Sequence, residues 1–201
     1  MIPELGHVAL IVGLQLALVQ GVAGLVGAAR ASAGLMALSR GAVAGQLFFV
    51  LAGFLALIGS FLVNDFSVMN VAEHSSRNMP IQYRFTAAWG SHEGSFLLWT
   101  TLMAAWTAAV LLFSRRLPAD LVARVVGIMG LLSFCFLAYI LFTSNPFMRL
   151  HPAPANGRDL NPLLQDPGMI LHPPLLYMGY VGFSVAFAFA IAALISGRLD
   201  Q

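Results

Sequence analysis

Five long apolar runs constrain this chain more than any other feature of its sequence. They occupy residues 7–29, 42–63, 95–113, 121–142 and 175–195. A helix needs roughly 20 mostly apolar residues to span the hydrocarbon core of a bilayer, and each run is about that long. The chain is 59% hydrophobic and only 9% charged, whereas a soluble domain has about 25% charged residues. We therefore predict an all-α, polytopic integral membrane protein with about five transmembrane helices.

The arginines predict the orientation of these helices. Cytoplasmic loops of membrane proteins carry an excess of Lys and Arg. With the N-terminus outside, six of the ten arginines fall on the inner side, namely Arg30, Arg40, Arg115, Arg116, Arg124 and Arg198. The other four lie in two long outer loops, residues 64–94 and 143–174. The first run is too long for the apolar region of a signal peptide, so we expect a retained helix. The inner loops are short and contain no distinctive motif, so we expect the functional site on the outer face.

Composition excludes several other classes of function. The chain has no lysine, and its arginines form no cluster beyond Arg115-Arg116. A basic face for nucleic-acid binding is therefore missing. The single cysteine, Cys135, lies in an apolar run, where we expect it to be a buried small hydrophobe. With no cysteine partner in this chain, it forms no internal disulfide.

The stretch D-P-G-M-I-L-H-P-P-L-L-Y-M-G-Y, residues 166–180, contains the strongest site candidate, His172. A proline disfavours the helical conformation of the residue before it, so His172 should precede the helix and Pro173 should occupy its first position. This would place an imidazole at the N-terminal end of a membrane helix, on a backbone that the following prolines restrict. From these residues alone, two interpretations stay open: His172 is a metal ligand, or it is an interfacial residue with an ordinary hydrogen-bond partner.

Three further candidates lie in W-G-S-H-E-G-S, residues 89–95. His92 and Glu93 could act as a proton relay or support a cofactor, or they could form a polar turn with Ser91 as N-cap. Trp89 could stack on a flat cofactor, although tryptophans at bilayer interfaces are common without any ligand. Phe96 occupies the position of the second histidine of the H-E-x-x-H zinc pattern, which is therefore absent.

Four motifs resemble the CcmF family, the large membrane subunits of the bacterial system I haem lyase within the CcmF/CcsA haem-handling proteins. They are W-G-S-H-E-G-S-F-L-L-W (residues 89–99), F-T-S-N-P-F (142–147), G-R-D-L-N-P-L-L-Q-D-P-G (157–168) and I-L-H-P-P-L-L-Y-M-G-Y-V-G-F-S-V-A-F-A-F-A (170–190). The whole chain, residues 1–201, resembles the N-terminal third of such proteins.

This resemblance implies a role in cytochrome c-type biogenesis. Members of the family take haem from the periplasmic chaperone CcmE and attach it to apocytochrome c, together with CcmH-type thiol proteins and in some cases CcmI or CcmG. Two periplasmic histidines that flank a W-W-D segment hold the transferred haem b, and two membrane histidines hold a structural haem. His172 matches the first periplasmic ligand. Trp89, His92 and Glu93 become candidates for the wall of the haem cavity.

The chain also departs from the family pattern. It contains no W-W-D segment, and it has no counterpart of the second periplasmic histidine or of the membrane-haem histidines. We therefore expect either an N-terminal fragment or one piece of a split protein that pairs with the rest of CcmF. By itself this part should not act as a haem lyase.

The resemblance places the protein in the bacterial inner membrane, with the long loops in the periplasm and the N-terminus outside. One alternative stays open, a membrane scaffold or docking subunit without its own cofactor. Co-purification of haem would distinguish the two functions.

Overall fold

The computed structural model describes residues 1–197 and is entirely helical there apart from loops and one isolated bridge. Five helices are long and apolar enough to cross a membrane, which confirms the sequence prediction. Two shorter helices, α3 (Met69–His74) and α4 (Ile81–Ala87), and the 3-10 turn η1 (Pro162–Leu164) lie in the connections. The five long helices are α1 (Ile2–Ala29), α2 (Ala33–Leu62), α5 (His92–Phe113), α6 (Ala119–Thr143) and α7 (Gly168–Ser196).

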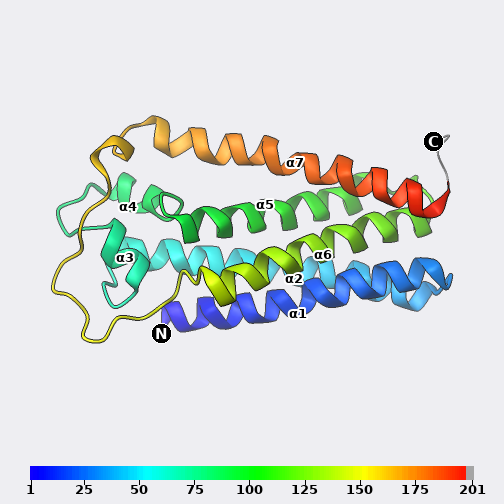
Figure 1. Ribbon diagram of the computed structural model, residues 1–201, viewed down its shortest axis with the longest axis horizontal. Helices are drawn as coiled ribbons and strands as arrows, with labels where there is room; N and C mark the ends of the chain where they lie inside the picture. The colour runs from blue at the N-terminus through cyan, green and yellow to red at the C-terminus, as the bar shows by residue number, and fades with distance from the viewer. Residues whose placement is uncertain (198–201) are drawn as a thin grey trace.

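Small residues bring α1 into close contact with its neighbours. A side chain at Gly24 would lie 2.6 Å from the carbonyl oxygen of Ala123 and 2.9 Å from the Cα atom of Gly127, both on α6. Membrane helices associate largely through such close packing, because lipid tails are as apolar as the helices themselves. The helices α1, α2 and α6 therefore form the tightest part of the bundle, with α5 beside α2 and α6 (Figure 1).

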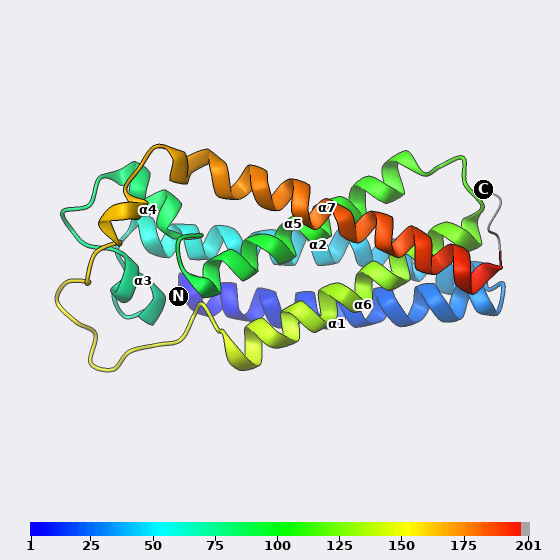
Figure 2. The ribbon, with the colours of Figure 1, turned by 45° about the horizontal axis from the view of Figure 1, so that its top comes forward.

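Helix α7 lies along the edge of the bundle, over α5 and α6 (Figures 1 and 2). Only 17% of an apolar 18-residue stretch of α7 is buried, against 44–50% in the other four long helices. Its buried residues are Val181, Ala188 and Ala192, which follow helical spacing along one face. The opposite face of α7 is largely exposed in the described part of the chain, as the side chains of Leu175, Phe183 and Leu194 show.

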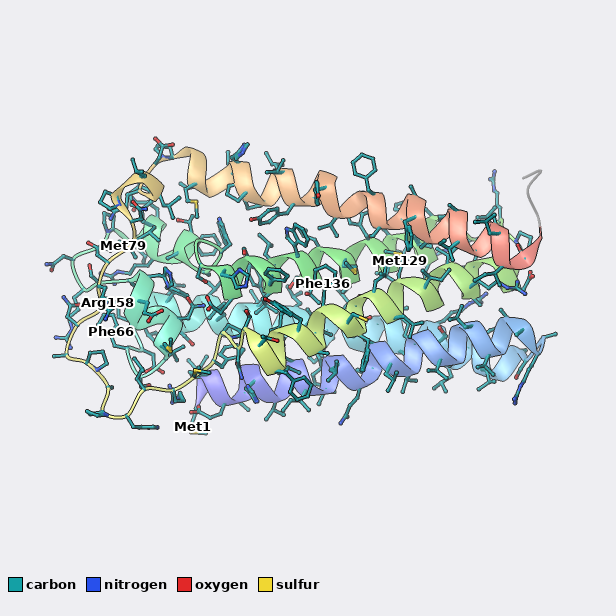
Figure 3. The ribbon with its side chains drawn as sticks, viewed as in Figure 1. Met1, Phe66, Met79, Met129, Phe136 and Arg158 are labelled. Atoms are coloured by element: carbon teal, nitrogen blue, oxygen red, sulfur yellow. The ribbon has the colours of Figure 1, made fainter. Side chains whose placement is uncertain are left out.

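Both long loops and the start of α1 lie at the same end of the bundle, as Figure 3 shows for Met1, Phe66 and Arg158. The loops are joined by a bridge between Val68 and Arg149. The Arg149 guanidinium pairs with the Glu4 carboxylate at 2.6 Å and with the Asp65 carboxylate at 3.3 Å. These contacts fix the loop end as one unit, from which α7 starts.

Two features differ from the sequence expectations. The first long loop contains α3 and α4, which are too short to be stable alone and form because they bury Val71, Ala72 and Ala87 in the core. Cys135 is exposed on α6, where we expected it to be buried. Because an apolar run in a membrane helix can face lipid as readily as protein, its composition does not predict which residues are covered.

Candidate functional site

The start of α7 differs from the prediction made for His172. The helix begins at Gly168, so His172 is its fifth residue and Pro173-Pro174 lie inside it. The Asp166 carboxylate accepts the N–H of Gly168 at 2.7 Å, and the Met169 N–H bonds to the Asp166 carbonyl at 2.9 Å. The first turn of α7 is therefore made by residues that precede the two prolines. The conformational preference of the residue before a proline is a tendency, and here it is outweighed.

Pro173 frees one backbone carbonyl of this first turn. In an α-helix the N–H of residue 173 would bond to the carbonyl of Met169, but proline has no N–H. The indole N–H of Trp89 donates to that carbonyl instead, at 3.0 Å. The orphaned acceptor is thus satisfied by a side chain 80 residues away, and Trp89 fixes the backbone that carries His172.

Trp89 itself is buried, with 6% of its surface exposed. Its ring packs edge-on against Phe85, with centroids 5.1 Å apart, and lies 6.4 Å from the ring of Phe54. The geometry gives this tryptophan a positioning role between α2, the α4–α5 connection and α7.

The His172 side chain is exposed and lies on the open face of α7. At 100° per residue, position 172 is opposite Val181 and about 160° away from Ala188. Leu175 and Leu176, one turn further along, are 62% and 52% exposed. Within residues 1–197 the imidazole has no hydrogen-bond partner, so it fits a ligand that approaches from outside this part of the bundle.

His92 and Glu93 occupy the first turn of α5, where Ser91 is the N-cap, as predicted. The Ser91 hydroxyl accepts the N–H of Gly94 at 3.0 Å. The His92 ring packs against Phe96, with centroids 4.8 Å apart, and its Nε2 lies 3.4 Å from the Tyr139 hydroxyl. Glu93 is partly buried. No contact joins His92 or Glu93 to His172 in the described residues.

An aromatic cluster extends from His92 along α5, α6 and α7. Trp99 is at its centre, with ring centroids 5.8 Å from Phe136, 5.6 Å from Tyr177 and 5.5 Å from Tyr180. A groove of about 320 Å³ opens beside Trp99, Phe136 and Tyr180, and Figure 3 shows Phe136 on α6. Sequence reasoning missed the tyrosines, although their spacing of three residues on one helix could have indicated a shared face.

The described part of the chain offers no multidentate metal site. No three His, Cys, Asp or Glu side chains of residues 1–197 gather closely enough to hold a metal ion. A metal bound at His172 would need its other ligands from a macrocycle or from another segment.

Sequence comparison identifies the family. The profile of the cytochrome c assembly protein family matches residues 89–200, more than half of the chain. The chain belongs to this family. It is 59% identical to the cytochrome c-type biogenesis protein CcmF of Escherichia coli strain K12, 57% to CcmF of Pseudomonas aeruginosa, and 51% to the cytochrome c-type biogenesis protein ccl1 of Rhodobacter capsulatus. Each match covers the whole chain and 31% of the relative.

A solved structure extends this family assignment to the fold. The cytochrome c heme lyase CcmF superposes with a TM-score of 0.85 at 26% identity, over the whole chain and 32% of that protein. The chain therefore corresponds to the N-terminal part of CcmF and spans about a third of the length of the curated relatives it matches. The resemblance inferred from the motifs is confirmed, as is the multi-pass membrane architecture.

Proposed function

We propose that this chain is the N-terminal part of a cytochrome c haem lyase and that His172 is an axial ligand to the haem being transferred. The observation that carries the proposal is the exposed, unpartnered imidazole on the open face of α7. An imidazole nitrogen is a common axial ligand of haem iron, and a ligand that must release its cargo benefits from an accessible position.

In this proposal haem is the substrate, taken from a CcmE-type chaperone and attached to apocytochrome c with a CcmH-type partner and in some species CcmI or CcmG. Such an assignment is supported by the names of the relatives, which describe cytochrome c-type biogenesis. The second axial ligand and the ligands of a structural haem would come from the remaining two thirds of the family's length.

Trp89 has a different role in this proposal from His92 and Glu93. Trp89 would act as a positioning residue, because it holds the Met169 carbonyl three residues before His172. His92 and Glu93 stay candidates for the wall of the haem cavity. His92 also contacts the aromatic cluster around Trp99, whose rings could pack against a flat macrocycle.

The proposed location is the bacterial inner membrane, with the N-terminus and both long loops in the periplasm. The two loops lie at the end of the bundle where α1 begins (Figure 1). Of the nine arginines within residues 1–197, five lie toward the opposite end, which agrees with the excess of positive charge expected on a cytoplasmic face.

The test is His172→Ala in the full-length gene. Periplasmic cytochromes would be stained for covalently bound haem, and immunoblotting would establish that the variant is inserted at normal levels. We expect loss of the stain and partial recovery with added imidazole. The matched control is His151→Ala, an exposed histidine of the same loop region, which should leave the stain unchanged.

Normal haem attachment by His172→Ala would refute the ligand assignment and favour a membrane scaffold without its own cofactor. Haem that co-purifies with the wild-type complex but is lost or spectrally altered in His172→Ala would refute the scaffold.

A further inference from the structure

A pocket of about 290 Å³ is lined by residues of α2, α5, α6 and the α5–α6 connection. This connection lies at the end of the bundle opposite the long loops (Figure 1). The pocket lies between helices, and its lining residues are Arg40, Leu111, Ser114, Arg115, Leu117 and Val122. Two of these six side chains are cations, one offers a hydroxyl, and none is acidic. The lining thus provides hydrogen-bond donors and positive charge at a level near the membrane surface.

The two cations have no acidic partner within residues 1–197. The cations of the ion pairs in this part of the chain are the N-terminal amine, Arg124 and Arg149, and not Arg40 or Arg115. Asp120 begins α6 close to the pocket in sequence, but its carboxylate bonds to Arg124 at 2.8 Å. Among the residues that the structure describes, the positive charge of the pocket is therefore not compensated, and an anion would neutralise it.

An apolar groove of about 440 Å³ continues from this pocket along α2 and α5. The two cavities share Arg40 and Leu111. Along α2 the groove extends from Arg40 to Leu51, a rise of about 16 Å at 1.5 Å per residue. Half of a hydrocarbon core of about 30 Å is about 15 Å, so the groove has the length of one leaflet.

We propose that this pocket and groove bind one anionic phospholipid of the leaflet opposite the long loops. The headgroup phosphate would lie between Arg40, Arg115 and Ser114, and an acyl chain would follow the groove past Leu47 and Phe48. Basic pockets between transmembrane helices are the usual setting for such recognition. The two arginines of the pocket favour an anionic headgroup. The apolar groove that adjoins the pocket favours a ligand with an acyl chain, which free phosphate lacks.

The experiment uses the full-length protein that contains this chain, purified in mild detergent. Native mass spectrometry would measure the lipid retained during titration with dioleoyl phosphatidylglycerol or with dioleoyl phosphatidylcholine. We expect at least tenfold tighter binding of the anionic lipid. An arginine that contacts the bound headgroup should contribute about fivefold to affinity, which is the general contribution of a basic residue at an anionic surface. Arg40→Gln with Arg115→Gln should therefore weaken binding about thirtyfold.

Three controls make the result specific. Arg116→Gln removes a neighbouring cation that does not line the pocket and should change affinity less than twofold. Arg40→Lys with Arg115→Lys keeps both charges and should keep most of the binding, which separates charge loss from misfolding. Ala44→Phe fills the groove and should weaken binding, whereas Ala37→Phe, on an exposed position of α2 outside the groove, should not.

Equal retention of both lipids would overturn the proposal, as would equal binding by the double glutamine variant and Arg116→Gln. Binding of glycerol 1-phosphate as tight as that of phosphatidylglycerol would assign the pocket to free phosphate instead.

Discussion

The indole N–H of Trp89 donates to the carbonyl oxygen of Met169 at 3.0 Å, and that carbonyl is the one which Pro173 leaves without a helical partner. A second indole repeats the contact further along α7, where Trp106 donates to the Met178 carbonyl at 3.0 Å. The residue four positions after Met178 is Gly182, which retains its N–H. The Trp89 contact therefore replaces a missing helical bond, whereas the Trp106 contact supplements an intact one.

Trp89→Phe should reduce haem attachment severalfold, because the carbonyl of Met169 loses its donor and the backbone before His172 loosens. An unsatisfied acceptor costs about 1–3 kcal/mol when buried, and the Met169 carbonyl is partly buried, so the melting temperature should also fall. Haem staining and thermal unfolding of the full-length variant would measure both effects. Trp106→Phe is the matched control, and it should leave haem attachment nearly intact.

Pro173→Ala tests in a second way whether Trp89 compensates for the N–H that Pro173 lacks. An alanine at this position restores the N–H that the Met169 carbonyl lacks, so Trp89→Phe should be less damaging in its presence. A double-mutant cycle on thermal stability should give a coupling of about 1 kcal/mol. Strictly additive effects would contradict the link between the indole and the proline.

Gly94→Ala should destabilise the protein by about 1–3 kcal/mol through overpacking. A Cβ atom at Gly94 would lie 1.8 Å from the carbonyl oxygen of Ala88, a backbone atom that can move only if the turn carrying Trp89 moves. Thermal unfolding would measure the loss. Gly34→Ala, where nothing lies within 4 Å of the added atom, should instead be neutral or slightly stabilising. A tolerated Gly94→Ala would show that this turn relaxes easily.

Asp65 makes the contact between the two long loops dependent on pH. Burial opposes its ionisation, but hydrogen bonds from Ser67 and Arg149 and the charge of Arg149 outweigh that effect and hold the pKa of the Asp65 carboxyl below its usual value. A depressed pKa stabilises the fold above the unfolded-state pKa of about 3.9, and this stabilisation is lost as the pH falls through the folded pKa.

Asp65→Asn should consequently lower the melting temperature by a small, constant amount between pH 8 and pH 5. The gap between wild type and variant should begin to narrow below about pH 4 and should disappear once the pH falls below the lowered pKa of the folded-state Asp65 carboxyl. The Asp65 and Arg149 side chains are 28% and 29% exposed, and ion pairs in contact with water contribute about 0–1 kcal/mol, so differential scanning calorimetry of matched samples is required. A gap that persists unchanged to pH 3 would refute the ionic origin of the contact.

Gln20 and Gln46 are buried in neighbouring helices and should respond differently to replacement by leucine. The Gln20 amide donates to the Val126 carbonyl on α6 at 2.8 Å, whereas neither polar atom of the Gln46 side chain has a hydrogen-bond partner among the described residues. A hydrogen bond between membrane helices contributes about 0.6–2 kcal/mol. Unfolding in mixed micelles should therefore show destabilisation by Gln20→Leu and little loss or a gain with Gln46→Leu. The reverse order would indicate that Gln46 holds ordered water.

Sequence alone determined the five membrane helices, because a spanning run is a local property of about 20 consecutive residues. It also predicted the N-cap at Ser91 and the resemblance to CcmF, both of which depend on short stretches of neighbouring residues. His172 was singled out for the same reason, since its two prolines are adjacent to it in the chain.

Only the tertiary structure decided where α7 starts and which way His172 faces. Asp166 caps the first turn locally, and the indole of Trp89, from another helix connection, satisfies the Met169 carbonyl that Pro173 leaves without a helical donor. The open face of α7 and the pocket between Arg40 and Arg115 likewise arise from packing between distant segments. In a chain this uniformly apolar, hydrophobic periodicity cannot separate a face that contacts protein from one that contacts lipid, so these relationships exist only once the helices are assembled.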